Sequence, residues 1–144
     1  MIKPIITDKK FLTIPSNLVQ VITPKVFDII KNLQDTANHH QTTKIGCEGL
    51  AANQIGYLYR IILVWNSKTW IIMINPIWEP RDGKLSNSHE GCLSRPSVSV
   101  KVKRHKRIKV WYEDKEGKLH SIKASHLTAR IVQHEVDHLN GVFI

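Results

Sequence analysis

The chain has 144 residues, a length typical of one compact domain, and 42% of them are hydrophobic, which excludes an intrinsically disordered chain. No stretch approaches the roughly 20 apolar residues that a membrane-spanning helix needs, so no membrane partner is expected. The formal net charge of +9 favours anionic surroundings such as nucleic acid or ribosomes, without identifying a partner. The chain starts without an apolar core of signal-peptide length, and with only Cys47 and Cys92 it is expected to be a cytoplasmic protein with reduced thiols.

The first predicted element is a helix that begins at Pro24, with Thr23 as its N-cap. It is expected to end near His39 and His40. Its apolar residues recur at helical spacing and predict one buried face: Val26, Phe27, Ile29, Ile30 and Leu33.

A glycine-containing loop over residues 45–56 is expected next, and strands follow it. The predicted strands are residues 61–65, 70–74, 98–104, 108–112 and 119–124. Asn66-Ser67 and the segment from Asp114 to Gly117 predict turns, whereas Pro76 and Pro80 are expected to limit regular structure after the second strand.

The last predicted element is a helix over residues 126–139, capped by Ser125 and ended by Asn140-Gly141. The expected fold class is therefore α+β, with mostly antiparallel strands around a C-terminal helix and a single domain over residues 1–144.

That helix carries the strongest chemical signal, His134-Glu135-Val136-Asp137-His138. Histidines four residues apart lie on one face of a helix, where both imidazoles can bind one metal ion. Glu135 lies beside that face, where it can act as general base on water at the metal. Leu127 and Ile131 share the face of His134 and are expected to form an apolar wall next to the metal.

A catalytic site of this kind usually has three protein ligands and one open position. Only Leu139 to Ile144 follow His138, so the third ligand must come from upstream. Spacing alone leaves several candidates: Cys92, Cys47, His89, His105, His120 and several acids. A thiolate is a strong ligand for a divalent transition metal, which favours one of the two cysteines.

Three motifs in this order resemble the peptide deformylase family. They are the loop Gly49-Leu50-Ala51-Ala52-Asn53-Gln54, the segment Glu90-Gly91-Cys92-Leu93-Ser94 and the helix from Gln133 to Leu139. The resemblance covers nearly the whole chain. It implies a hydrolase that removes the formyl group from the N-terminal formyl-methionine of newly made polypeptides and releases formate.

The resemblance also implies roles for individual residues. Cys92, His134 and His138 would bind one divalent metal ion, with Fe(II) as the native ion and Zn or Ni as substitutes. Glu135 would accept a proton from water and pass it to the leaving amine, while Gln54 and the backbone N–H of Leu93 would stabilise the oxyanion. The residues expected to contact substrate are Gly49, Glu48, Gly91, Leu127, Arg130 and Ile131.

The chain departs from the family pattern at three places. Cys47 replaces a glycine of the loop, and Glu48 stands where the family has an apolar residue. Arg130 also replaces an apolar residue, so we hypothesise that Glu48 and Arg130 pair across the mouth of the pocket. The chain stops soon after His138, as in short members from phages, so the location is expected to be the cytoplasm of a bacterial or phage-infected cell.

Many bacterial members of the family continue with a further helix after the metal-binding helix. In place of that helix, the basic run from Lys101 to Arg107 could contact ribosomal RNA, although a solvated strand face is the alternative. The protein is expected to be a monomer. Two other functions are compatible with part of the sequence, a small metallopeptidase and an RNA-binding protein without catalysis. The intact motif from Glu90 to Ser94 argues against the first, and the joint presence of the proposed ligands and Glu135 argues against the second.

Overall fold

The structure is a computed structural model and describes residues 1–43 and 46–144. The helices that it describes are α1 (Lys9–Leu12), α2 (Pro24–Gln41), the short 3-10 helix η1 (Ala52–Ile55) and α3 (His126–Leu139). The strands are β1 (Gly49–Ala51), β2 (Ile61–Trp65), β3 (Trp70–Pro80), β4 (Leu85–Cys92), β5 (Arg95–His105), β6 (Arg107–Glu113) and β7 (Leu119–Ser125). No helix in these described ranges is long and apolar enough to cross a membrane.

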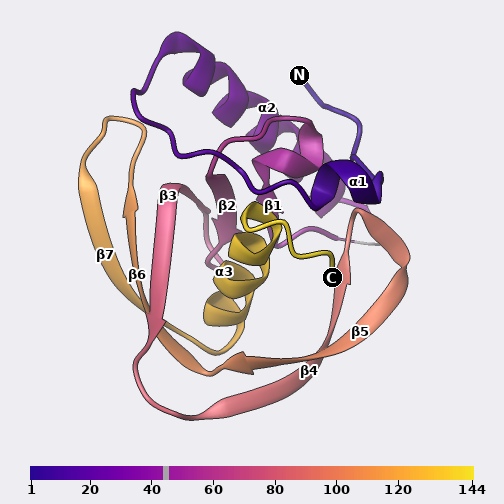
Figure 1. Cartoon of the computed structure of the whole chain (residues 1–144), viewed down its shortest axis with the longest axis vertical. Helices are drawn as coiled ribbons and strands as arrows, with labels where there is room; N and C mark the ends of the chain where they lie inside the picture. The colour runs from indigo at the N-terminus through magenta and orange to yellow at the C-terminus, as the bar shows by residue number, and fades with distance from the viewer. Residues whose placement is uncertain (44–45) are drawn as a thin grey trace.

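The strands form two separate antiparallel sheets. One is five-stranded in the order β1-β2-β3-β6-β7, and the other is the β4–β5 ribbon. Figure 1 shows α3 between the five-stranded sheet and the ribbon, with α1 and α2 at the end of the molecule where α3 finishes. The α+β class and the antiparallel pairing predicted from the sequence are therefore confirmed.

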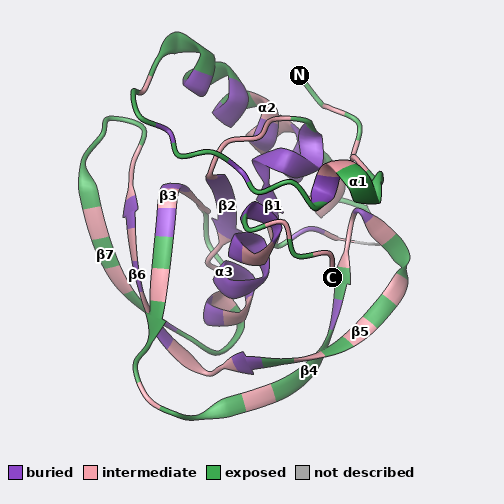
Figure 2. Cartoon of the chain, in the orientation of Figure 1, coloured by how far each residue is buried: buried purple, intermediate pink, exposed green. Residues whose placement is uncertain are grey.

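Helix α3 is held against the five-stranded sheet by apolar packing. Val132 and Leu139 of α3 are fully buried in one cluster with Ile62 of β2, Met73 of β3 and Val110 of β6. Burying side chains of this size contributes roughly 1.5–3 kcal/mol each. In Figure 2 most of α3 is buried, whereas much of the β4–β5 ribbon is exposed. The helix that carries the histidines is thus the central element of the fold.

Helix α2 follows the sequence prediction closely. It begins at Pro24, and Val26, Ile29, Ile30 and Leu33 are buried against β1 and β2 in a second cluster. Phe27 was expected in the same face but is 46% exposed. The prediction for Phe27 is wrong because Phe27 lies beside the buried apolar face of α2 and does not reach the sheet.

Strand β3 runs further than the prolines suggested. It continues through Pro76 to Pro80, because its pairing changes from β2 to β6 along its length. The register with β6 shifts between Ile74 and Ile77, so the missing N–H of Pro76 falls at an irregularity of the ladder. Asn75, at the same place, has a positive φ of 52°.

Strand β4 was not predicted, and β5 begins at Arg95, earlier than expected. The sequence of β4, Leu-Ser-Asn-Ser-His-Glu-Gly-Cys, has no apolar alternation, because only Glu90 on this strand is buried. The predicted loop over residues 45–56 also contains structure, namely β1 and η1, while Ile45 lies outside the described residues.

The end of α3 agrees with its predicted stop signal. Asn140 caps the helix, and Gly141 has a positive φ of 75°. At the other end, Ser125 occupies the N-cap position but its side chain makes no capping hydrogen bond. Thr23 likewise precedes α2 without such a bond.

Gly141 is expected to be required for stability. A Cβ atom at this position would lie 2.5 Å from the backbone oxygen of Thr13, in addition to the strain of a left-handed conformation. We predict that Gly141→Ala lowers the free energy of unfolding by about 1–3 kcal/mol in urea titrations. Gly83→Ala is the matched control, because a Cβ atom there would have no atom within 4 Å. Equal stability of the two variants would contradict this account.

Candidate metal centre

The two histidines of α3 face one another in the interior. His134 and His138 are 7% and 3% exposed, and their Nε2 atoms lie 3.1 Å apart. This arrangement follows directly from their spacing of one helical turn. Two imidazole nitrogens at this distance form one side of a binding site for a cation.

The third donor comes from the end of β4. The Sγ atom of Cys92 lies 3.3 Å from Nε2 of His138, and one ligand atom from each of Cys92, His134 and His138 lies within 4.8 Å of the others. No other such cluster occurs within residues 1–43 and 46–144. The structure therefore selects Cys92 from the candidates that spacing left open.

The other candidates lie elsewhere. Cys47 is a buried free thiol that donates to the backbone oxygen of Gly49 at 3.3 Å. His120 pairs with Asp114 at 2.7 Å. His105 is joined through its backbone to a side chain of α3, and His89 lies on an exposed position of β4.

Two of the three donor separations match those expected around a tetrahedral metal ion. Bonds of about 2.0–2.1 Å to nitrogen and about 2.3 Å to sulfur place neighbouring ligands about 3.3–3.6 Å apart. The observed separations of 3.1 Å between the two histidine nitrogens and 3.3 Å between Cys92 and His138 are close to these ligand-to-ligand distances. One thiolate and two imidazoles suit Zn, Fe, Co or Ni, and three protein ligands leave a coordination position for a reactant.

Glu90 holds His134 in the orientation that this site needs. Its Oε1 lies 2.8 Å from Nδ1 of His134, so that Nε2 is directed to the other donors. A carboxylate behind a ligating histidine fixes both its tautomer and its ring plane. The sequence indicated Glu90 only as part of a motif and gave it no role.

Glu90 is itself surrounded by cations. Arg104 of β5 donates to both of its oxygens, at 2.9 and 3.1 Å, and Arg104 also pairs with Asp137. Burial alone would raise the pKa of Glu90, but the hydrogen bonds from His134 and Arg104 lower it to about 2. The carboxylate is therefore ionised throughout the physiological range.

The two imidazoles respond oppositely to this environment. Burial opposes the charged form of both, but bonds to Cys92 and Glu90 raise the pKa of His134. Burial and the neighbouring His134 together lower the pKa of His138. A metal ion binds unprotonated nitrogen atoms, so metal binding at this site would compete with protonation of His134.

Glu135 lies beside the donors in a desolvated position. It is 5% exposed, and burial raises its pKa to about 7. Its Oε1 is buried with no hydrogen-bond partner among the described residues, which leaves it available to a reactant. A carboxylate with a pKa near neutrality suits a general base.

Gly49 allows β1 to approach this carboxylate. A Cβ atom on Gly49 would lie 2.6 Å from Oε2 of Glu135 and 2.7 Å from a methyl group of Ile131. Any side chain here would displace Glu135 or the helix. Glycine is therefore needed at position 49 so that Glu135 can keep its place beside the metal donors.

Gln54 presents its amide nitrogen to the centre. The backbone N–H of Ala51 donates to its Oε1 at 3.0 Å, which fixes the amide plane. Its Nε2 then points to Sγ of Cys92 at 3.3 Å and to Oγ of Ser94 at 3.2 Å. Asn53, the preceding residue, donates to the backbone oxygen of His138 at 2.8 Å and ties η1 to α3.

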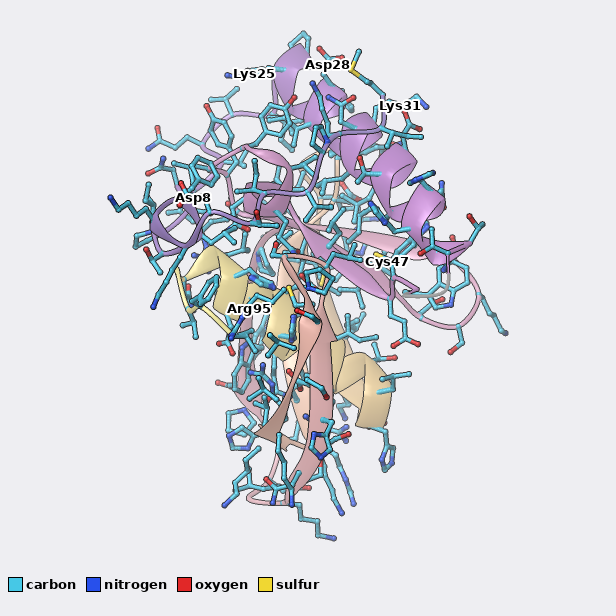
Figure 3. The ribbon with its side chains drawn as sticks, turned by 90° about the vertical axis from the view of Figure 1, so that its right-hand side faces the viewer. Asp8, Lys25, Asp28, Lys31, Cys47 and Arg95 are labelled. Atoms are coloured by element: carbon cyan, nitrogen blue, oxygen red, sulfur yellow. The ribbon has the colours of Figure 1, made fainter. Side chains whose placement is uncertain are left out.

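A cavity of about 460 Å³ opens onto these groups. Its lining includes every residue that the sequence suggested for substrate contact: Glu48, Gly49, Gly91, Leu127, Arg130 and Ile131. Gln54, Leu93, Cys92, His134 and Glu135 line it as well. Figure 3 shows Cys47, another lining residue, on the chain segment that leads from α2 into β1.

The hypothesis that Glu48 and Arg130 pair across the mouth of the cavity is wrong. Arg130 pairs with Glu90 at 2.5 Å instead, while the described residues contain no ion pair for the exposed Glu48. The buried carboxylate of Glu90 attracts the guanidinium more strongly because it is shielded from water.

Arg104 is a second residue of the site, besides Glu90, whose role the sequence did not indicate, because it lies within a run of basic residues typical of a surface. It is 7% exposed. The alternation along β5 could have indicated that Arg104 is buried. Val98, Val100, Val102 and Arg104 are every second residue of this strand, so Arg104 shares the inward face of the three valines.

Comparisons with known proteins show which family this chain resembles over nearly its whole length. A family model described as polypeptide deformylase matches residues 2–144. A peptide deformylase of Dictyoglomus turgidum is 38% identical over 133 residues, covering 92% of this chain and 83% of the relative. One of Dictyoglomus thermophilum is 41% identical over 122 residues, covering 83% and 79% respectively. The crystal structure of the peptide deformylase from Thermotoga maritima has 30% identity and a TM-score of 0.91, covering 99% of this chain and 95% of that one.

The two cysteines are expected to differ in reactivity. Burial raises the pKa of Cys47 to about 12, so its thiolate fraction at pH 8 is on the order of 10⁻⁴. We predict that iodoacetamide modifies only Cys92 in the metal-free protein, and that added Zn²⁺ or Co²⁺ protects it. Peptide mass mapping would identify the site, with Cys47→Ala as the control. Modification of Cys47 first would contradict the assignment.

Proposed function

The chain belongs to the polypeptide deformylase family, amidohydrolases that remove the N-formyl group from newly made polypeptides, and we propose that Cys92, His134 and His138 hold the metal ion for this reaction. The observation that carries the proposal is the convergence of one thiol and two imidazoles within 4.8 Å, beside a cavity that Cys92 and His134 line. The chain would act as a single catalytic domain.

When bound, a divalent ion supplies Lewis-acid activation of water and of a carbonyl oxygen. Glu135 is proposed to accept the proton of the attacking water and to pass it to the amine that leaves. Its burial, its free Oε1 and a pKa raised to about 7 support both transfers at neutral pH. The products are formate and a free N-terminal amine.

Two donors are proposed to stabilise the oxyanion that develops on the formyl carbonyl. One is Nε2 of Gln54, whose direction is fixed by the bond between its Oε1 and Ala51. The other is the backbone N–H of Leu93, which follows Cys92 and lines the same cavity. Removing one donor of this kind typically lowers kcat by a factor of about 100–1,000.

The methionine side chain is proposed to enter the cavity beside α3. Ile131 and Leu127 offer apolar surface there, and Gly49 and Gly91 let the substrate backbone approach. A formyl group carries no substituent beyond hydrogen, so a narrow space above the metal donors would accept it and exclude larger acyl groups.

The ligand set supports several ions, and we propose Fe(II) as the native ion, with Zn or Ni able to replace it. The substrate is the formyl-methionyl nascent peptide, and we propose that the reaction takes place in the cytoplasm of a bacterial or phage-infected cell. We also propose that the protein acts as a monomer, because the residues of one chain complete the site.

Formate release from formyl-Met-Ala-Ser tests the proposed roles. The protein is purified without oxygen and loaded with Fe(II), Ni or Zn. We predict that kcat/KM rises with pH through about 7, because only the unprotonated Glu135 accepts a proton.

Glu135→Gln should lower kcat on the order of 100-fold or more.

Glu116→Gln is the matched control, since Glu116 is exposed in the turn between β6 and β7. Its activity should equal that of the parent protein. A Glu135→Gln variant that binds metal and retains full activity would falsify the assignment of the general base.

We further propose that basic residues of the ribbon favour contact with ribosomal RNA. Lys101 and Lys103 are exposed side by side on one face of β5, on either side of the inward Val102. Arg104 does not contribute, because it is buried in its ion pairs. The electrostatic attraction is thus smaller than the sequence of the run suggested.

Sedimentation with ribosomes at increasing salt tests this contact. Lys101→Gln with Lys103→Gln should weaken binding by a few fold and reduce its salt dependence, because fewer counterions are released from RNA. Binding that is unchanged by salt and by these substitutions would argue against the basic face.

A further inference from the structure

Arg130 lines the cavity, but its polar contacts lead away from it. Its Nη1 donates to Oε2 of Glu90 at 2.5 Å and to the backbone oxygen of Val102 at 3.1 Å. Its Nη2 donates to both the backbone oxygen and Oγ of Ser86, at 2.9 and 3.0 Å. One side chain of α3 therefore binds both strands of the ribbon.

These contacts complete the hydrogen bonding of Glu90. Its Oε1 accepts from Arg104 and from Nδ1 of His134, and its Oε2 accepts from Arg104 and from Arg130. A carboxylate offers about four acceptor positions, and all four are used here. The plane of Glu90 is fixed from β5 by one guanidinium and from α3 by the other.

The two arginines are not equivalent. Arg104 is divided between Glu90 and Asp137 and reaches the carboxylate from the ribbon itself. Arg130 lies one helical turn before His134 on the same face of α3, so it couples Glu90 to the element that carries the histidines. Without Arg130, Oε2 of Glu90 would keep only its bond from the ribbon.

We infer that Arg130 is a positioning residue for the metal ligand His134, acting through Glu90. Arg130 fixes the carboxylate, Glu90 fixes the ring of His134 through Nδ1, and Nε2 is thereby held toward Cys92 and His138. The inference rests on the proposed role of His134 as a ligand. It also explains why a guanidinium occurs in the cavity wall between the apolar side chains of Leu127 and Ile131.

A structural role alone predicts something different. Gln133 also joins α3 to the ribbon, because its side chain donates to the backbone oxygen of His105 and accepts from its N–H, both at 2.9 Å. Gln133 makes no hydrogen bond to Glu90. If Arg130 served only to attach the ribbon, substitutions of Arg130 and Gln133 would have the same consequences.

The test compares the full-length protein with Arg130→Met, Arg130→Lys and Gln133→Met. Co(II) affinity is measured by competition with a chelator, together with the visible spectrum of the Co(II) protein and the midpoint of urea unfolding. Methionine keeps an unbranched stem but cannot donate. We expect Arg130→Met to weaken Co(II) binding about tenfold and to change the spectrum, since partners of a ligand typically affect affinity by 10–100-fold.

Arg130→Lys should recover part of the affinity, because its ammonium can pair with Glu90 but cannot also reach Ser86 and Val102. Gln133→Met should lower stability and leave affinity and spectrum unchanged. Parental affinity and spectrum in Arg130→Met would overturn the inference, as would an equal loss of affinity in Gln133→Met. Should Arg130→Met fail to fold, a fully parental Arg130→Lys would overturn it as well.

The same measurement separates this inference from the proposed function. A parent protein that binds no Co(II) would refute the metal site itself. A parent that binds Co(II) tightly and an Arg130→Met variant that binds equally well would refute only the role of Arg130.

Discussion

The position of one buried carboxylate, Glu90, determines how the two halves of the site meet. A buried charge is costly unless it is paired, and removing one partner of such a pair typically costs about 3–5 kcal/mol. Arg104, Arg130 and His134 satisfy Glu90 from two different elements. Cys92 follows Glu90 by two residues at the end of the same strand, so fixing Glu90 against α3 also holds this end of β4 beside the histidines, where Sγ of Cys92 lies 3.3 Å from Nε2 of His138.

This constraint matters because the β4–β5 ribbon has little apolar surface to attach it. The five-stranded sheet and α3 are joined by fully buried side chains such as Ile62, Met73 and Val132, whereas β4 buries only Glu90. Polar contacts therefore replace hydrophobic burial on one side of the site. Hydrogen bonds are directional, so they also set the ring plane of a ligand, which nonpolar packing specifies less strictly.

The sequence predicted well those parts that depend on local pattern. The span of α3, the stop at Asn140 and the three strands at 61–65, 108–112 and 119–124 follow from apolar periodicity and turn residues, and the structure contains them. Strand β4 could not be found this way, because its polar sequence forms a strand only through pairing with β5. The pairing of Arg130 was assigned to the wrong acid, since sequence does not show that Glu90 is buried and Glu48 exposed.

The identity of the third metal ligand likewise does not follow from local sequence pattern. Donor chemistry narrowed the choice to two cysteines, and the family resemblance implied Cys92. The tertiary structure gives the physical reason, because it brings the end of β4 within 3.3 Å of His138. X-ray absorption of the metal-loaded protein tests this centre most directly. The account predicts one sulfur at about 2.3 Å and two imidazole nitrogens at about 2.0–2.1 Å from the ion. A first shell without sulfur, or with two sulfurs, would contradict it.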